Sequence, residues 1–235
     1  MQSTVSVITK SRVPLVVGAT AGVLAWVGLA AGGLPAWAGG PPPAPRAVVA
    51  QAQGPKLDGA APEVVVYAAD LPKSALSEFE YWPDPAAPGG KLVGTPNTGG
   101  QLDPPPENDP HVTFKVPVQR GVPYRCWVHM KVGTPKGKSQ ANKLWVQFSE
   151  AVDTANKEAF QPGTGSYLTA QGPTQPGWTW VPCDAAGATA LVAFRTSGEV
   201  TVRVQAGMEG VGFDQVLLSP ARFLDTPPAE AVVKK

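Results

Sequence analysis

Short apolar runs and strict alternation of apolar with polar residues dominate the middle of this chain. In His111–Val118 and Tyr124–Lys131 every second side chain is apolar, which is typical of a strand with one face on a core. Gly and Pro, 26 and 27 of 235 residues, interrupt these runs at short intervals and favour many short strands. The pattern predicts strands in Val64–Ala68, His111–Val118, Tyr124–Lys131, Leu144–Ser149, Trp178–Val181, Leu191–Arg195, Val200–Ala206 and Val211–Leu218.

This spacing predicts an all-β domain, an antiparallel β-sandwich of the jelly-roll kind. Only Ser74–Glu80 and Asp153–Phe160 have a weakly helical pattern. Both segments are short and lack a sustained apolar stripe, so neither predicts a helix that could carry a core.

The alternation also predicts which side chains share a face. Cys126, Val128 and Met130 are expected to point into the core, with their neighbours on the opposite side. The outer faces then mix aromatic side chains with polar ones, which is unusual for a plain solvent face. These outer positions are Arg125, Trp127, His129, Trp145, Gln147, Arg203 and Gln205.

The N-terminus has the pattern of an export signal. Lys10 and Arg12 precede Val13–Leu34, an uncharged run of about 22 residues, and Ala36-Trp37-Ala38 is a small-x-small cleavage pattern. A second cleavage pattern is Ala50-Gln51-Ala52. The run is also long enough to span a bilayer of ~30 Å, so an uncleaved membrane anchor is the alternative.

Composition then divides the chain into four parts. Residues 1–38 are the signal segment, and the Pro- and Ala-rich residues 39–61 are expected to form an extended linker. The β-sandwich is expected over residues 62–224, followed by a flexible tail over residues 225–235. About 160 residues suffice for one domain with a full core.

Charge narrows the class of partner. The net charge is +1, only 16% of the residues are charged, and the basic residues are scattered. Nucleic acids and anionic membranes require concentrated Lys and Arg, so neither is an expected partner. Contact with a membrane is expected only through an uncleaved N-terminal segment, and the protein is expected to be secreted, periplasmic or on the cell surface.

Several segments together resemble one known fold family. YRCWVHMK, LWVQFSEAVD, GWTWV and SGEVTVRVQAGMEGVGFDQVLLSP are similar to a domain of exported bacterial proteins. That domain is a galactose-binding-like β-sandwich, akin to the carbohydrate-binding modules of families 6 and 35. The resemblance covers roughly residues 62–224 and implies sugar binding.

Aromatic residues beside Gly and Pro are the first candidates for such a site. A Trp or Tyr ring stacks on the apolar face of a sugar, while amide and carboxylate groups bond its hydroxyls. The expected sugar-binding residues are Trp82, Asp84, Asn97, Tyr167, Trp178 and Trp180, with Tyr81 and Asp184 nearby. The alternative is that each ring fills the core or an edge of the sandwich.

A structural Ca²⁺ ion is implied by the resemblance. Asp70 follows the first predicted strand and Asp214 lies in the last, and these strands would be neighbours if the sheet closes as it does in the similar modules. Glu63 and Glu209 are further candidates. Because Ca²⁺ takes six to eight oxygen ligands, a single Asp is weak evidence for such a site. The alternative is that Asp214 only bonds backbone groups.

The two cysteines, Cys126 and Cys183, could form one disulfide in an oxidising compartment. Such a bond requires Cα atoms within ~7 Å. The alternative is that Cys126 acts as a small apolar core residue.

No catalytic pattern stands out. The two histidines, His111 and His129, lie in no HExxH motif, and GxSxG, P-loop and Rossmann patterns do not occur. The sequence therefore favours a non-catalytic, secreted carbohydrate-binding protein. Two alternatives stay open: a hydrolase with two carboxylates, and an anchored adhesion or structural protein that binds another protein through Trp127 and Trp145.

Fractionation of the expressing cells tests the two roles of the N-terminal segment. We expect the protein in the soluble exported fraction with a shortened N-terminus, because the Gly- and Ala-rich run is only moderately apolar. Pelleting with membranes and an intact N-terminus would favour the anchored form.

Overall fold

The computed structural model describes residues 61–136 and 140–228. They form thirteen strands and three short 3-10 turns, with no α-helix in these ranges. None of the helical segments among these residues is long and apolar enough to span a membrane. The turns are Ala68–Asp70, Lys73–Ala75 and Pro88–Gly90. The strands are β1 (Val64–Tyr67), β2 (Leu76–Ser77), β3 (Glu80–Pro83), β4 (Lys91–Gly94), β5 (His111–Val118), β6 (Arg125–Val132), β7 (Lys143–Phe148), β8 (Ala151–Val152), β9 (Leu168–Gln171), β10 (Gly177–Asp184), β11 (Ala193–Phe194), β12 (Gly198–Ala206) and β13 (Gly212–Ser219).

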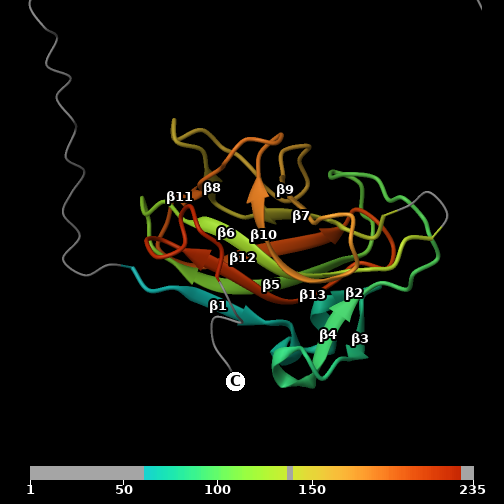
Figure 1. Cartoon of the computed structure of the whole chain (residues 1–235). Helices are drawn as coiled ribbons and strands as arrows, with labels where there is room; N and C mark the ends of the chain where they lie inside the picture. The colour runs from blue at the N-terminus through green and yellow to red at the C-terminus, as the bar shows by residue number, and fades with distance from the viewer. Residues whose placement is uncertain (1–60, 137–139, 229–235) are drawn as a thin grey trace, which may run out of the picture. The chain divides into compact units, whose positions relative to one another are not determined.

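Eleven of these strands form two antiparallel layers joined through β10, and β8 and β11 pair in a separate two-stranded sheet (Figure 1). In the first layer, here called sheet A, the order is β3-β4-β13-β6-β10, and β1 also pairs with β13. In sheet B the order is β10-β9-β7-β12-β5-β2. Residues 177–182 of β10 pair with β6, whereas Cys183 and Asp184 pair with β9. The predicted all-β sandwich is therefore confirmed, and each of the eight predicted runs contains a strand.

The core lies between the two sheets and follows the predicted alternation. Cys126, Val128 and Met130 of β6 face it from sheet A. Leu144, Val146 and Phe148 of β7 face it from sheet B. Burying these side chains between stacked sheets provides the main driving force for folding.

The two weakly helical segments contain no α-helix. Lys73–Ala75 forms a 3-10 turn and the chain then enters β2 and β3. In the second segment, Asp153 Oδ1 accepts hydrogen bonds from Ala155 N (2.8 Å) and Lys157 N (3.0 Å), which holds a turn instead of a helix.

The outer faces of both sheets are not bare, which corrects the expectation of an exposed aromatic surface. Trp127 is buried and its Nε1 donates to Phe223 O (2.7 Å), because the chain after β13 folds back over it. Trp145 is only 6% exposed. The prediction that these two rings form an exposed contact surface for another protein is therefore wrong. The buried polar residues of these faces are Arg125, Gln147, Arg203 and Gln205.

These polar side chains anchor the covering loops. Arg125 donates from Nη1 to Ala190 O (2.8 Å) and pairs through Nη2 with Asp184 (2.7 Å). Gln147 Nε2, with its two N–H groups, lies within hydrogen-bond distance of three carbonyls of one loop, those of Gln161, Thr164 and Ser166. The polar character of the outer faces thus serves internal hydrogen bonding.

Cys126 and Cys183 are both fully buried free thiols and are neighbours in the core. They meet where β10 leaves β6 to join β9. Burial raises the pKa of the Cys183 thiol well above its usual range, and the neighbouring Cys126 adds to this. The disulfide stays a prediction from the sequence.

A thiol-reactive reagent tests this environment. We expect the reduced, folded protein to react very slowly with a disulfide reagent at pH 8, because little thiolate forms at a buried thiol of raised pKa. Both thiols should react rapidly after unfolding in guanidinium chloride. Fast reaction of the folded protein would contradict the buried arrangement, and unreactive thiols in the unfolded protein isolated without reductant would reveal a disulfide.

Candidate functional site

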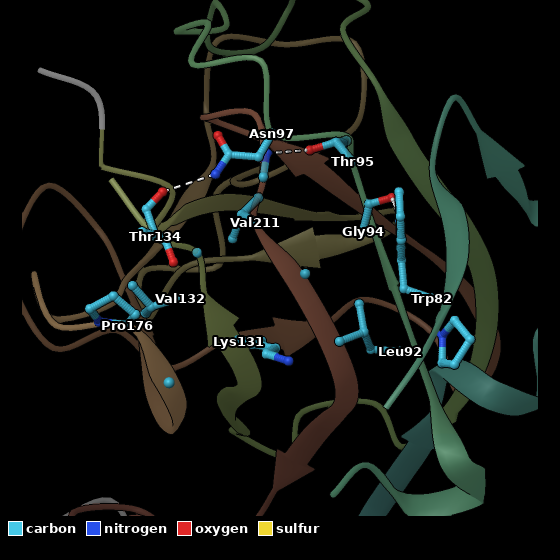
Figure 2. Close-up of a pocket in the computed structure, with 15 residues that line it drawn as sticks. Trp82, Leu92, Gly94, Thr95, Asn97, Lys131, Val132, Thr134, Pro176 and Val211 are labelled. Atoms are coloured by element: carbon cyan, nitrogen blue, oxygen red, sulfur yellow. Dashed lines mark hydrogen bonds between the residues drawn. The ribbon is translucent and has the colours of Figure 1, made fainter. Parts of the chain in front are cut away.

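One cavity of about 540 Å³ opens on the outer face of sheet A, at one end of its strands. It crosses from Trp82 on β3 to Pro176 and Gly177 at the start of β10. Figure 2 shows Trp82 and Pro176 at opposite ends of the cavity, with Lys131 between them. Its volume lies in the range of small-molecule sites in proteins.

Two glycines form the floor of this cavity. Gly94 of β4 lies directly opposite Gly212 of β13, and Gly212 in turn lies opposite Lys131 of β6. A Cβ atom at Gly212 would come within 2.6 Å of the Leu92 side chain, so no larger residue fits there unchanged. A Cβ atom at Gly94 would also meet Leu92 Cδ1, at 3.2 Å, so the Leu92 side chain lies over both glycines and forms the floor of the cavity with them.

Trp82 provides the apolar wall. It is 41% exposed and is the one exposed large hydrophobic side chain among the described residues. Its Nε1 donates to Gly94 O (3.3 Å) across the β3–β4 pair, which fixes the plane of the ring. An indole held in this way offers a preorganised stacking surface.

Uncharged polar groups line another side of the cavity. Asn97 Nδ2 donates to Thr134 O (2.9 Å) and so links two loops, as Figure 2 shows. Thr95 Oγ1 accepts from Gly210 N (3.0 Å), and the residue is buried at the edge of the cavity. These amide and hydroxyl groups suit hydrogen bonding to the hydroxyls of a sugar.

Lys131 is the one charged side chain that lines the cavity. Its Nζ lies 2.6 Å from Asp84 Oδ2; the lysine side chain is 45% exposed and that of Asp84 only 6%. Burial alone would raise the pKa of Asp84. The hydrogen bonds from Lys131 and Ala86 N outweigh it, so the pKa is lowered. At neutral pH the cavity thus carries a compensated ion pair.

The structure brings together only some of the predicted sugar-binding residues. Trp82 and Asn97 line the cavity, and Asp84 reaches it through Lys131. The sequence missed Lys131, because its partner Asp84 is 47 residues away in a loop. The alternation in Tyr124–Lys131 does place Lys131 on the outer face, and this was the one feature of the sequence that could have indicated its role.

Trp178 and Trp180 lie farther along the same face around His129. The His129 ring stacks on Trp178 with centroids 4.8 Å apart and planes 14° apart, and it lies 4.9 Å from Trp180. Both rings are half-buried. Both indoles contact the His129 ring, and Trp178 lies opposite Lys131 in the β10–β6 pair, so the two indoles form an aromatic wall beside the cavity.

Tyr167 and Asp184 lie elsewhere, on the outer face of sheet B. They line a second cavity of about 470 Å³ together with Trp145, whose ring centroid is 5.8 Å from that of Tyr167. Asp184 is engaged by Arg125. Tyr81 donates its hydroxyl to Leu71 O and does not line the cavity on sheet A.

The structure places the predicted calcium ligands in different surroundings. Asp70 is exposed at the end of the first 3-10 turn, whereas Asp214 is buried. Glu63 Oε1 accepts from Ser219 Oγ (3.0 Å), and Glu209 Oε2 accepts from Gly100 N (2.8 Å). Within residues 61–136 and 140–228, no three or more His, Cys, Asp or Glu side chains group to hold a metal ion. The calcium site stays a prediction of the resemblance.

Asp214 sits in a β-bulge of β13. The register with β6 shifts between Phe213 and Gln215, so Asp214 is the extra residue, and its Oδ1 lies 2.7 Å from His129 Nδ1. Burial raises the pKa of the Asp214 carboxyl group, and the contact with His129 offsets only part of this effect.

No known family model and no curated protein sequence matches the chain. Solved structures do. A β-(1,4)-mannanase from Podospora anserina with a family 35 module matches 68% of this chain but only 28% of its own, at 12% identity and a TM-score of 0.44. The C-terminal family 6 module of a laminarinase from Zobellia galactanivorans matches 67% of this chain and 99% of its own, at 11% identity and a TM-score of 0.43. A family 35 module from Clostridium thermocellum matches 66% of this chain and 97% of its own, at 16% identity and a TM-score of 0.40. At identities this low, the ligands of these proteins are not assigned to this chain.

Replacing Asp214 with Asn tests the buried carboxyl group. A raised pKa in the folded state means that the contribution of Asp214 to stability is fully present below the ordinary pKa of an aspartate. It is lost as the pH rises through the raised value. We therefore expect the stability of the wild type relative to D214N, measured by urea unfolding, to fall as the pH rises from 3 to 7. A difference that grows with pH would contradict this assignment.

Proposed function

We propose that the β-sandwich is a non-catalytic carbohydrate-binding domain of an exported protein, and that sugars bind in the cavity on sheet A. The observation that carries this proposal is the fixed, exposed ring of Trp82 at the edge of a glycine-floored cavity. A stacking ring beside uncharged hydrogen-bonding groups is the combination that sugar recognition requires.

The second cavity is a weaker candidate because its rings are less available. Trp145 is buried, and Tyr167 is half-buried against it. These two rings contact each other, with centroids 5.8 Å apart, which leaves less of their surface for a sugar than the exposed ring of Trp82 offers. The proposal therefore places binding at Trp82.

The balance of forces predicts the character of binding. Ring stacking and a few hydrogen bonds to neutral groups give modest affinity. Because the ion pair of Lys131 with Asp84 is compensated, no net charge attracts the ligand, and affinity should change little with salt concentration.

Replacing Trp82 with Ala tests the proposal. The wild type is expected to be retarded in native gels that contain the polysaccharide it binds. Loss of a central aromatic anchor costs about 2 kcal/mol or more, which is roughly a thirtyfold loss of affinity. The midpoint of thermal unfolding should change little, because the ring is exposed.

The matched control is Tyr167→Ala, which removes an aromatic ring from the other sheet. It should bind like the wild type. Retained binding by W82A, or loss of binding by Y167A alone, would place the site elsewhere. A wild-type protein that binds none of a broad panel of polysaccharides would refute the function.

A further inference from the structure

The cavity on sheet A is long in one direction. Between Trp82 and Pro176 it crosses β3, β4, β13, β6 and β10. Neighbouring strands lie about 4.8 Å apart, so four such steps span about 19 Å. A pyranose ring is about as wide as one of these steps. The cavity is therefore several sugar rings long, which exceeds what a single terminal sugar would need.

Contacts are distributed along this length. Trp82 and Leu92 form one end, and Pro176 and Val132 the other. Asn97 joins the loop after β4 to the loop after β6. A ligand that touched only Trp82 would leave the far end of the cavity empty.

The electrostatics oppose a negatively charged ligand. An anion would have to compete with Asp84 for the Lys131 ammonium group at 2.6 Å. Asp84 is buried with a lowered pKa, so it stays ionised at neutral pH and repels a second carboxylate. The other polar side chains that line the cavity are Thr95, Asn97 and Thr134, none of them charged.

From these observations we propose that the cavity binds an internal segment of an uncharged polysaccharide, several rings long, lying across the strands from Trp82 to Pro176. This inference rests on the proposed function and specifies the ligand class for the same site. Over Gly94 and Gly212 the chain would lie on the apolar side chain of Leu92, which covers both glycines.

The first experiment compares neutral with acidic polymers. Native gels containing galactomannan, β-glucan or arabinoxylan are set beside gels containing polygalacturonate or alginate. We expect retardation of the wild type by at least one neutral polymer and by neither acidic one. Strongest retardation by an acidic polymer would overturn the inference while leaving carbohydrate binding intact, and no retardation by any polymer would refute both.

The variant Asp84→Asn complements this comparison, because it is expected to gain binding to an acidic polymer. Asn keeps an acceptor for Ala86 N but leaves the Lys131 charge uncompensated. We expect D84N to become retarded by polygalacturonate, and more so at low salt. If D84N is no more retarded than the wild type, the ion pair does not set the charge preference.

The second experiment measures length. Fragments of two to six sugars, prepared from the neutral polymer that binds, are titrated calorimetrically. Affinity should rise by about tenfold or more from two sugars to four, and reduction of the fragment ends should leave it unchanged. Equal affinity for two and six sugars would overturn the inference but not the function.

Pro176→Ala then tests the far end of the cavity. Pro176 is exposed in a loop, so the variant should fold. It is expected to weaken binding of six sugars severalfold and to leave the binding of two sugars at Trp82 unchanged. Pro173→Ala, an exposed proline of the same loop that does not line the cavity, is the control. Equal effects of both variants, or no effect of P176A, would contradict an extended ligand.

Discussion

The register of β13 against β4 and β6 is the constraint on which the site depends. It sets Gly212 opposite both Gly94 and Lys131, and these three residues line the cavity beside Trp82. Because side chains alternate between faces, a slip of one residue would turn Phe213 into this row and fill it. All residues of β13 are buried, and the strand pairs with β6 on one side and with β1 and β4 on the other, which holds the register firmly.

The bulge at Asp214 adjusts this register partway along the strand. Before it, Phe213 points into the core opposite Met130; after it, Gln215 lies opposite His129 on the outer face. The carboxyl group of Asp214 is thereby brought to His129, whose ring packs against Trp178 and Trp180. The same irregularity that ends the glycine floor thus anchors the aromatic wall beside it.

The sequence was sufficient for the architecture but not for the loops. Alternation in β5, β6, β7 and β12 placed strands and faces correctly, since burial of one face in a sandwich leaves that pattern. The strands β2, β3, β4, β8 and β9 were not predicted, because two to four residues are too few to show an alternation; β1 and β11 are as short, but they lie in longer apolar runs. Trp127 and Trp145 were expected to be bare because alternation shows which face a side chain takes, but not which distant segment covers that face. For the same reason the sequence proposed one group of aromatic residues where the structure has three: Trp82 at the cavity, Trp178 and Trp180 around His129, and Tyr167 on the other sheet.

The central claim is that the ring of Trp82 meets the sugar. The side-chain N–H signals of the tryptophans, seven in the full chain, can be followed by two-dimensional NMR during titration with a neutral oligosaccharide. The account predicts that the Trp82 signal shifts most, while the signal of Trp145 on the opposite sheet stays in place. A titration that shifts Trp145 and leaves Trp82 unchanged would contradict it.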